Sequence, residues 1–96
     1  MSKNEILALL GDYKNKSTEK YGILALGLFG SAARDEERDD SDVDVVVKMK
    51  KPDLFFMVHI KDELERILRS QVDIIAYGAS MNPYLKNRID KEACYV

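Results

Sequence analysis

Hydrophobic residues recur with two different spacings along the chain, and these spacings predict alternating helices and strands. Apolar positions three to four residues apart predict helices over residues 3–21, 52–70 and 82–93, and good helix formers predict a short helix over 32–38. Short apolar or β-branched runs predict strands over 23–29, 43–50 and 71–77, with a final edge strand over 94–96. This order predicts an α/β (α+β) fold with one small mixed sheet of three to four strands flanked by helices.

The length and composition of the chain fit one small domain. With 96 residues, of which 46% are hydrophobic and 33% charged, we expect a single domain over 1–96 with a modest core. Phe55, Phe56 and Met57 are expected in that core, with one Phe left for a partner interface as the alternative. The sequence shows no signal peptide and no stretch long enough to span a bilayer, and Cys94 is its single cysteine. These features predict a cytoplasmic protein without a membrane partner.

Acidic residues are concentrated in one segment. Residues 30–44 carry a net charge of −5, whereas the whole chain carries −2, so the remainder carries +3. This balance gives no reason to expect direct nucleic-acid binding. Within the segment, Asp42 and Asp44 are two residues apart at the start of a predicted strand, so their side chains share a face about 6 to 7 Å apart. Val43, Val45 and Val47 take the opposite face and are predicted core residues.

Two carboxylates at one strand edge repel each other unless a cation lies between them. At 4 Å and an effective dielectric constant near 20, this repulsion costs roughly 4 kcal/mol. Asp73 adds a third acid within the predicted strand 71–77. If this strand neighbours strand 43–50, the three carboxylates meet and form a site suited to one or two Mg²⁺ ions and phosphate chemistry.

Gly30 and Ser31 lie between a predicted strand and a predicted helix start, close to this acidic site. Such a turn directs backbone N–H groups outward, Gly30 permits close approach, and the Ser31 hydroxyl can donate a further hydrogen bond to a phosphate. Taken separately, these two residues could form a helix cap, the acidic run a solvated turn, and Asp73 a partner for Arg34 or Arg38. Their joint occurrence predicts a site for a nucleoside triphosphate with bound Mg²⁺.

The segment "LFGSAARDEERDDSDVDVVV" resembles the signature of the DNA polymerase beta-type nucleotidyltransferase superfamily, and most closely that of the minimal nucleotidyltransferases. The resemblance extends to "QVDIIAY" and "YLKNRIDKEACYV". It implies the polymerase beta-type nucleotidyltransferase fold, with a triphosphate held by the Gly-Ser pair and by the arginine of "AR-x-E". It further implies catalytic and metal-binding roles for three acids, the third of which also helps to deprotonate the acceptor. The implied nucleotide-binding residues are Gly30, Ser31 and Arg34, and the implied acids are Asp42, Asp44 and Asp73.

Members of the resembled family are usually encoded beside a HEPN-domain protein, as the antitoxin of a toxin–antitoxin pair. The resemblance therefore implies transfer of AMP from ATP to a tyrosine of a HEPN toxin, with two Mg²⁺ ions. A non-catalytic antitoxin that covers its toxin and a nucleotidyltransferase acting on a small molecule are the alternatives. The nucleotide base, the acceptor residue, the number of nucleotides transferred and the oligomeric state stay open. So does the effect of Asp35, which stands where the family usually has Gly.

Overall fold

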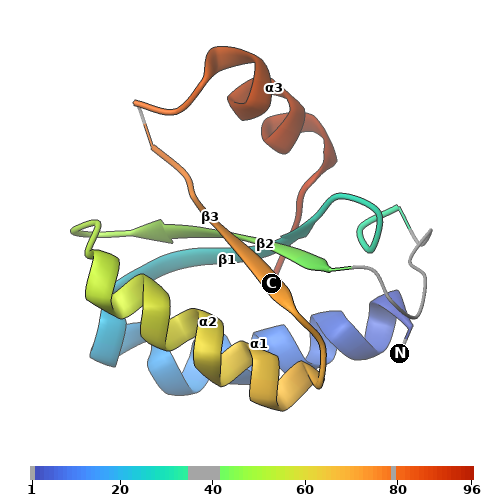
Figure 1. The fold of residues 1–96 in the computed structure, drawn as a ribbon, viewed down its shortest axis with the longest axis vertical. Helices are drawn as coiled ribbons and strands as arrows, with labels where there is room; N and C mark the ends of the chain where they lie inside the picture. The colour runs from blue at the N-terminus through green and yellow to red at the C-terminus, as the bar shows by residue number, and fades with distance from the viewer. Residues whose placement is uncertain (1, 35–41, 79) are drawn as a thin grey trace.

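The computed structural model describes residues 2–34, 42–78 and 80–96, and within these ranges the chain forms helices on both faces of a four-stranded sheet (Figure 1). The elements are α1 (Lys3–Tyr21), β1 (Ile23–Phe29), β2 (Val43–Met49), α2 (Leu54–Leu68), β3 (Val72–Ala76), α3 (Pro83–Glu92) and β4 (Cys94–Tyr95). The predicted long helices and the predicted strands are thus confirmed. No helix in the described ranges is long and apolar enough to cross a membrane.

The short helix predicted over 32–38 differs from the structure where the structure describes it. Residues 31–34 form turns, in which the amide of Arg34 donates to the carbonyl oxygens of Gly30 and Ser31, both at 3.2 Å. The remainder of that predicted helix, together with Asp35, lies outside the described residues. Good helix formers did not decide this segment, because the left-handed backbone of Gly30 (φ +76°) fixes the direction in which the chain leaves β1.

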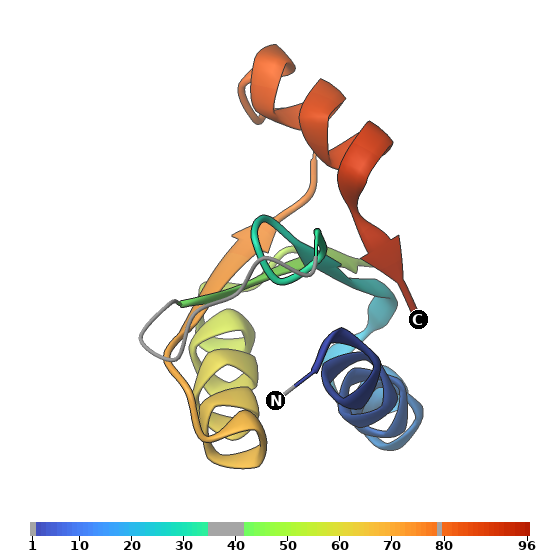
Figure 2. The same ribbon diagram turned by 90° about the vertical axis from the view of Figure 1, so that its right-hand side faces the viewer.

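The sheet has the strand order β3-β2-β1-β4 and mixes both pairing directions. β1 pairs antiparallel with β2 and with β4, whereas β2 and β3 are parallel and are joined through α2. Helices α1 and α2 lie on one face of the sheet and α3 lies on the other (Figure 2). The end of β1 and the starts of β2 and β3 therefore meet at one end of the sheet (Figure 1).

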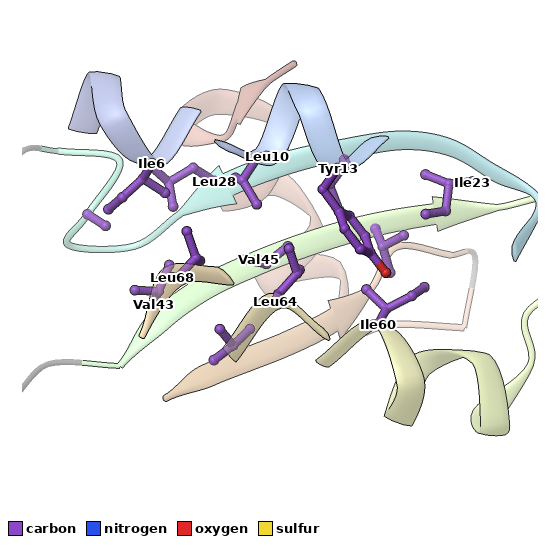
Figure 3. Close-up of a cluster of buried hydrophobic side chains, with 14 of the residues drawn as sticks. Ile6, Leu10, Tyr13, Ile23, Leu28, Val43, Val45, Ile60, Leu64 and Leu68 are labelled. Atoms are coloured by element: carbon purple, nitrogen blue, oxygen red, sulfur yellow. The ribbon is translucent and has the colours of Figure 1, made fainter. Parts of the chain in front are cut away.

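The larger core lies between the sheet and the helices α1 and α2. Side chains at helical spacing from α1 and α2 meet the inward-facing valines of β2 there (Figure 3). Val43, Val45 and Val47 belong to this core, as predicted from their alternation along the strand. A smaller buried cluster of Phe29, Val46 and Ile89 lies on the opposite face, beneath α3.

The start of α2 departs from the predicted core. Leu54 and Phe55 leave 78% and 79% of their surface exposed, so the expectation that Phe55 is a core residue is wrong. Phe56 is also exposed and belongs to neither buried cluster, so the core expectation is wrong for it as well, although its ring packs edge-on against Tyr21 at 5.2 Å. Met57 packs against the core, as expected. Asp53 caps α2 by accepting a hydrogen bond from the amide of Phe56, and this fixes which side chains of the first turn face outward.

A polar network joins α1 to α2 beside the larger core. The hydroxyl groups of Tyr13 and Tyr21 donate to the two carboxylate oxygens of Glu63, at 2.6 and 2.8 Å. Burial alone would raise the pKa of Glu63, but these two hydrogen bonds, with the charge of Lys20, hold it below its ordinary value. The network therefore stabilises the ionised form of Glu63 between the two helices.

Candidate active site

The register of the two parallel strands brings Asp44 and Asp73 together. Asp44 pairs with Asp73 across β2 and β3, and with Phe29 across β1. Partners in register on neighbouring strands share a face of the sheet, and such strands lie about 4.8 Å apart. Val46 and Ile75, two residues further along each strand, pack beneath α3, so the two acids open toward the α3 face. The predicted neighbourhood of these two strands is confirmed.

Asp42 completes the acidic group from the residue position just before β2. Its side chain is exposed, as is that of Asp73, whereas Asp44 is half-buried between them. The pKa of Asp44 is raised, first by burial and then by the negative charges of Asp73 and Asp42, with Arg34 acting in the opposite direction. The Asp44 carboxyl group is thus close enough to Asp73 and to Asp42 to feel their negative charges.

The turn after β1 packs directly against Asp44. A Cβ atom placed on Gly30 would collide with Oδ2 of Asp44 and lie 3.2 Å from its Cγ. Gly30 also has a positive φ of +76°, which side chains rarely adopt. The backbone conformation favours glycine here, and a side chain at this position would displace the Asp44 carboxylate. The buried Gly30 and the half-buried Ser31 therefore lie beside the acids.

Helix α3 contributes charged groups to the same end of the sheet. Arg34 Nη1 lies 3.8 Å from Oε2 of Glu92, and Arg88 Nη2 lies 3.4 Å from the same oxygen. The guanidinium group of Arg88 also stands over the ring of Phe29, 5.8 Å from its centre. Sequence reasoning identified neither Arg88 nor Glu92 as a site residue. Their spacing of four residues signals a helical ion pair, but only tertiary packing shows that the pair meets Arg34.

An open groove of about 710 Å³ borders the acids on the β3 side. Asp42 and Asp73 line this groove together with Lys61 and Glu65 of α2 and with Arg69, which directly follows that helix. The sequence did not predict this groove, because it forms only when α2 packs beside the start of β3 in the folded chain.

The donor set fits a hard divalent cation such as Mg²⁺, since all three acids offer carboxylate oxygens. Among the described residues, however, no three acidic, histidine or cysteine side chains are already gathered closely enough to hold a metal ion. The metal-binding and nucleotide-binding roles predicted from the sequence stay predictions.

Comparison with known proteins gives a consistent picture. The family model described as "Polymerase beta, Nucleotidyltransferase" matches residues 13–96. A Methanocaldococcus jannaschii protein, provisionally named a protein adenylyltransferase, is 35% identical over 94 residues, covering 97% of this chain and 96% of its own. The protein adenylyltransferase MntA of Thermococcus cleftensis is 30% identical over 97 residues, covering 100% of this chain and 97% of its own.

Solved structures share the same fold. One provisionally named a minimal nucleotidyltransferase superposes with a TM-score of 0.81 at 28% identity, covering 98% of this chain and 95% of the other. A complex of a tri-AMPylated Shewanella oneidensis HEPN toxin with an MNT antitoxin contains a chain that superposes with a TM-score of 0.61 at 21% identity, covering 97% and 66%. At that identity the second likeness concerns the fold alone. With most of its length matched by the family model and nearly all of it aligned to relatives at 30% identity or more, the chain belongs to the polymerase beta-type nucleotidyltransferase family.

Proposed function

We propose that this protein transfers AMP from ATP to a tyrosine hydroxyl of a HEPN-domain toxin in the cytoplasm, and so acts as an antitoxin. The observation that carries the proposal is the register of Asp44 with Asp73, directly beside the turn at Gly30. Two similar proteins support the proposal. The Thermococcus cleftensis relative is named a protein adenylyltransferase, and the structurally similar MNT antitoxin was solved in complex with an AMPylated HEPN toxin.

In the proposed reaction the acceptor oxygen forms a bond to the α-phosphorus of ATP. The bond from that phosphorus to the oxygen bridging the α- and β-phosphates breaks, and pyrophosphate leaves. Asp73 accepts the hydroxyl proton, because it is exposed at the edge of the acidic group. Gly30 and Ser31 hold the triphosphate close to the sheet, and Arg34 offsets its negative charge.

Magnesium would be held by Asp42, Asp44 and Asp73, whose carboxylate oxygens are the ligands that it prefers. Two bound ions would neutralise phosphate charge and lower the pKa of the attacking hydroxyl group. The protein's own contribution is then placement, because two neighbouring strands hold Asp44 and Asp73 in register beside the turn at Gly30.

The test is transfer of radioactive label from α-labelled ATP to the HEPN-domain protein of the same genome, with Mg²⁺ or with EDTA. We expect labelling that requires Mg²⁺ and that falls on the order of a hundredfold or more in Asp44→Asn and Asp73→Asn. Asp62→Asn is the matched control, because Asp62 is exposed on α2 and does not line the groove. Toxin neutralisation that survives in both site variants, without label, would instead establish the non-catalytic alternative.

Binding can be measured independently of activity. At a concentration of MgATP about one hundred times its Kd, the folded state gains about 2.7 kcal/mol, and the melting temperature rises accordingly. ATP with EDTA is expected to give a much smaller rise, because the acids would then face the phosphates without a cation between them. Equal rises with Mg²⁺ and with EDTA would exclude a metal-dependent site.

A further inference from the structure

The groove beside Asp73 occupies the side of the acids opposite the Gly30 turn. The strand order β3-β2-β1 places Asp73 on one flank, Asp44 in the middle, and Gly30 after β1 on the other flank. In an in-line displacement, the attacking oxygen and the leaving pyrophosphate lie on opposite sides of the phosphorus atom. If the triphosphate is held at Gly30, the acceptor approaches from the β3 side. The groove lies at this edge of the sheet, where Asp73 and residues of α2 both line it.

Two of the charged groups that line the groove are paired with each other. Lys61 Nζ lies 3.0 Å from Oε2 of Glu65, and that same oxygen accepts a hydrogen bond of 3.0 Å from the amide of Val72. Lys61 and Glu65 thus form a neutral, satisfied pair. Arg69 differs, because it makes no ion pair or side-chain hydrogen bond with any residue that the structure describes. The groove therefore offers one cation to an incoming chain.

The backbone of Arg69 is also unusual. Arg69 ends α2 in the left-handed conformation (φ 53°, ψ 40°), and among the described residues it is the one non-glycine with a positive φ. This conformation costs about 1–2 kcal/mol for a residue with a Cβ atom, and glycine commonly takes this position after a helix. A cation at a helix C-terminus recovers part of that cost, but Arg66 already supplies one in the same turn. The left-handed turn directs the chain from α2 back toward β3, and it leaves the exposed side chain of Arg69 in the lining of the groove.

We propose that the groove is the acceptor site and that Arg69 binds a carboxylate near the modified hydroxyl of the partner protein. This inference rests on the proposed function and names what that function leaves open: how the acceptor chain is recognised. The recognised partner is a polypeptide with an Asp or Glu side chain close to the acceptor. Its carboxylate pairs with the Arg69 guanidinium group, and the acceptor hydroxyl then lies beside Asp73, across the groove.

The test compares two identical substitutions on the same helix, Arg69→Gln and Arg66→Gln, in steady-state labelling of the HEPN-domain protein. Both remove one positive charge from the end of α2, but only Arg69 lines the groove. We expect Arg69→Gln to raise the KM for the acceptor protein about tenfold, the size of one charge-assisted hydrogen bond, and to leave the KM for ATP unchanged. Arg66→Gln is expected to change neither value by more than twofold.

A third variant separates function from folding. Arg69→Gly relieves the left-handed strain, so its melting temperature should equal or exceed that of the wild type while its acceptor KM rises as in Arg69→Gln. An acceptor KM within twofold of wild type in both Arg69 variants would overturn this inference and leave the proposed function intact. Absence of labelling by the wild-type protein would overturn the proposed function, and this inference with it.

Discussion

Replacing Gly30 with alanine tests the contact that joins the turn to the acids. The new Cβ atom would meet Asp44 Oδ2 and would sit in a left-handed conformation. The conformation costs about 1–2 kcal/mol, and forced packing adds about 1–3 kcal/mol. Reduced freedom of the unfolded chain returns about 0.4–1 kcal/mol. We therefore expect Gly30→Ala to lower the free energy of unfolding by about 3 kcal/mol, with the three terms spanning roughly 1–5 kcal/mol.

Gly22 provides the matched control, because it shares the conformation without the contact. Its φ is +66°, and a Cβ atom there would lie 3.7 Å from Cβ of Lys50, an ordinary separation. Gly22→Ala should therefore cost about 1 kcal/mol, from the conformation alone. Urea denaturation of both variants isolates the contact with Asp44 as the difference between them. In a domain of this size each 1 kcal/mol lowers the melting temperature by about 4–8 °C, so heating offers a second measurement.

Removing the Asp44 carboxylate completes a double-mutant cycle of Gly30→Ala with Asp44→Ala. In an Asp44→Ala background, the cost of Gly30→Ala should fall toward that of Gly22→Ala, because the colliding atoms are gone. Equal costs of Gly30→Ala and Gly22→Ala in the wild-type background would refute the reasoning. So would an excess cost that persists without the carboxylate.

Three further predictions follow from charge and burial. In metal-free buffer, Asp44→Asn should stabilise the fold at pH 7, because the folded-state pKa of Asp44 is raised. This gain in stability should shrink as the pH falls through that pKa. Chemical denaturation at a series of pH values measures the gain, with Asp62→Asn as the control. Glu63→Gln should cost about 1–2 kcal/mol at neutral pH, because it weakens the hydrogen bonds from Tyr13 and Tyr21. Since the pKa of Glu63 is lowered, that stability is present above its ordinary pKa and is lost as pH falls through the folded value, so wild type and Glu63→Gln should converge in acid. Phe55→Ser should change the free energy of unfolding by less than about 0.5 kcal/mol, since Phe55 is largely exposed; a large loss in thermal melting would contradict its placement.

Much of the fold could be predicted because periodicity reports burial directly. The alternation of Val43, Val45 and Val47 with more polar neighbours is a local signal, and these residues line the larger core as predicted. The turn after β1 was predicted less well, because its geometry depends on the φ of Gly30 and on contact with Asp44, which is distant in sequence. The exposure of Phe55 depends on how Asp53 orients the first turn of α2, which apolar content does not reveal.

Part of the candidate site was also predictable, because the positions of its acids along the strands are a local feature of the sequence. The sequence predicted that Asp42 and Asp44 lie close together at the start of one strand. It predicted that Asp73 joins them only if its strand is the neighbour of that strand, and the parallel pairing of β2 with β3 meets this condition. The groove and the left-handed Arg69 could not be predicted, because arginine carries no signal for positive φ and the groove forms only when α2 returns to the sheet. The pairing of Glu92 with both arginines likewise joins residues that only folding brings together.

The two faces of the sheet are covered unequally, so folding stability depends mainly on one face while the other can tolerate substitution. Most of the apolar packing lies on the α1 and α2 side, whereas α3 packs through its buried Ile89 on Phe29 and Val46 of the sheet. Substitutions at exposed positions of α3 should therefore cost little folding stability, although α3 and the acids lie on the same face of the sheet. A fold arranged in this way can change its ligand preference through substitutions in α3 while the larger core between the sheet, α1 and α2 stays the same.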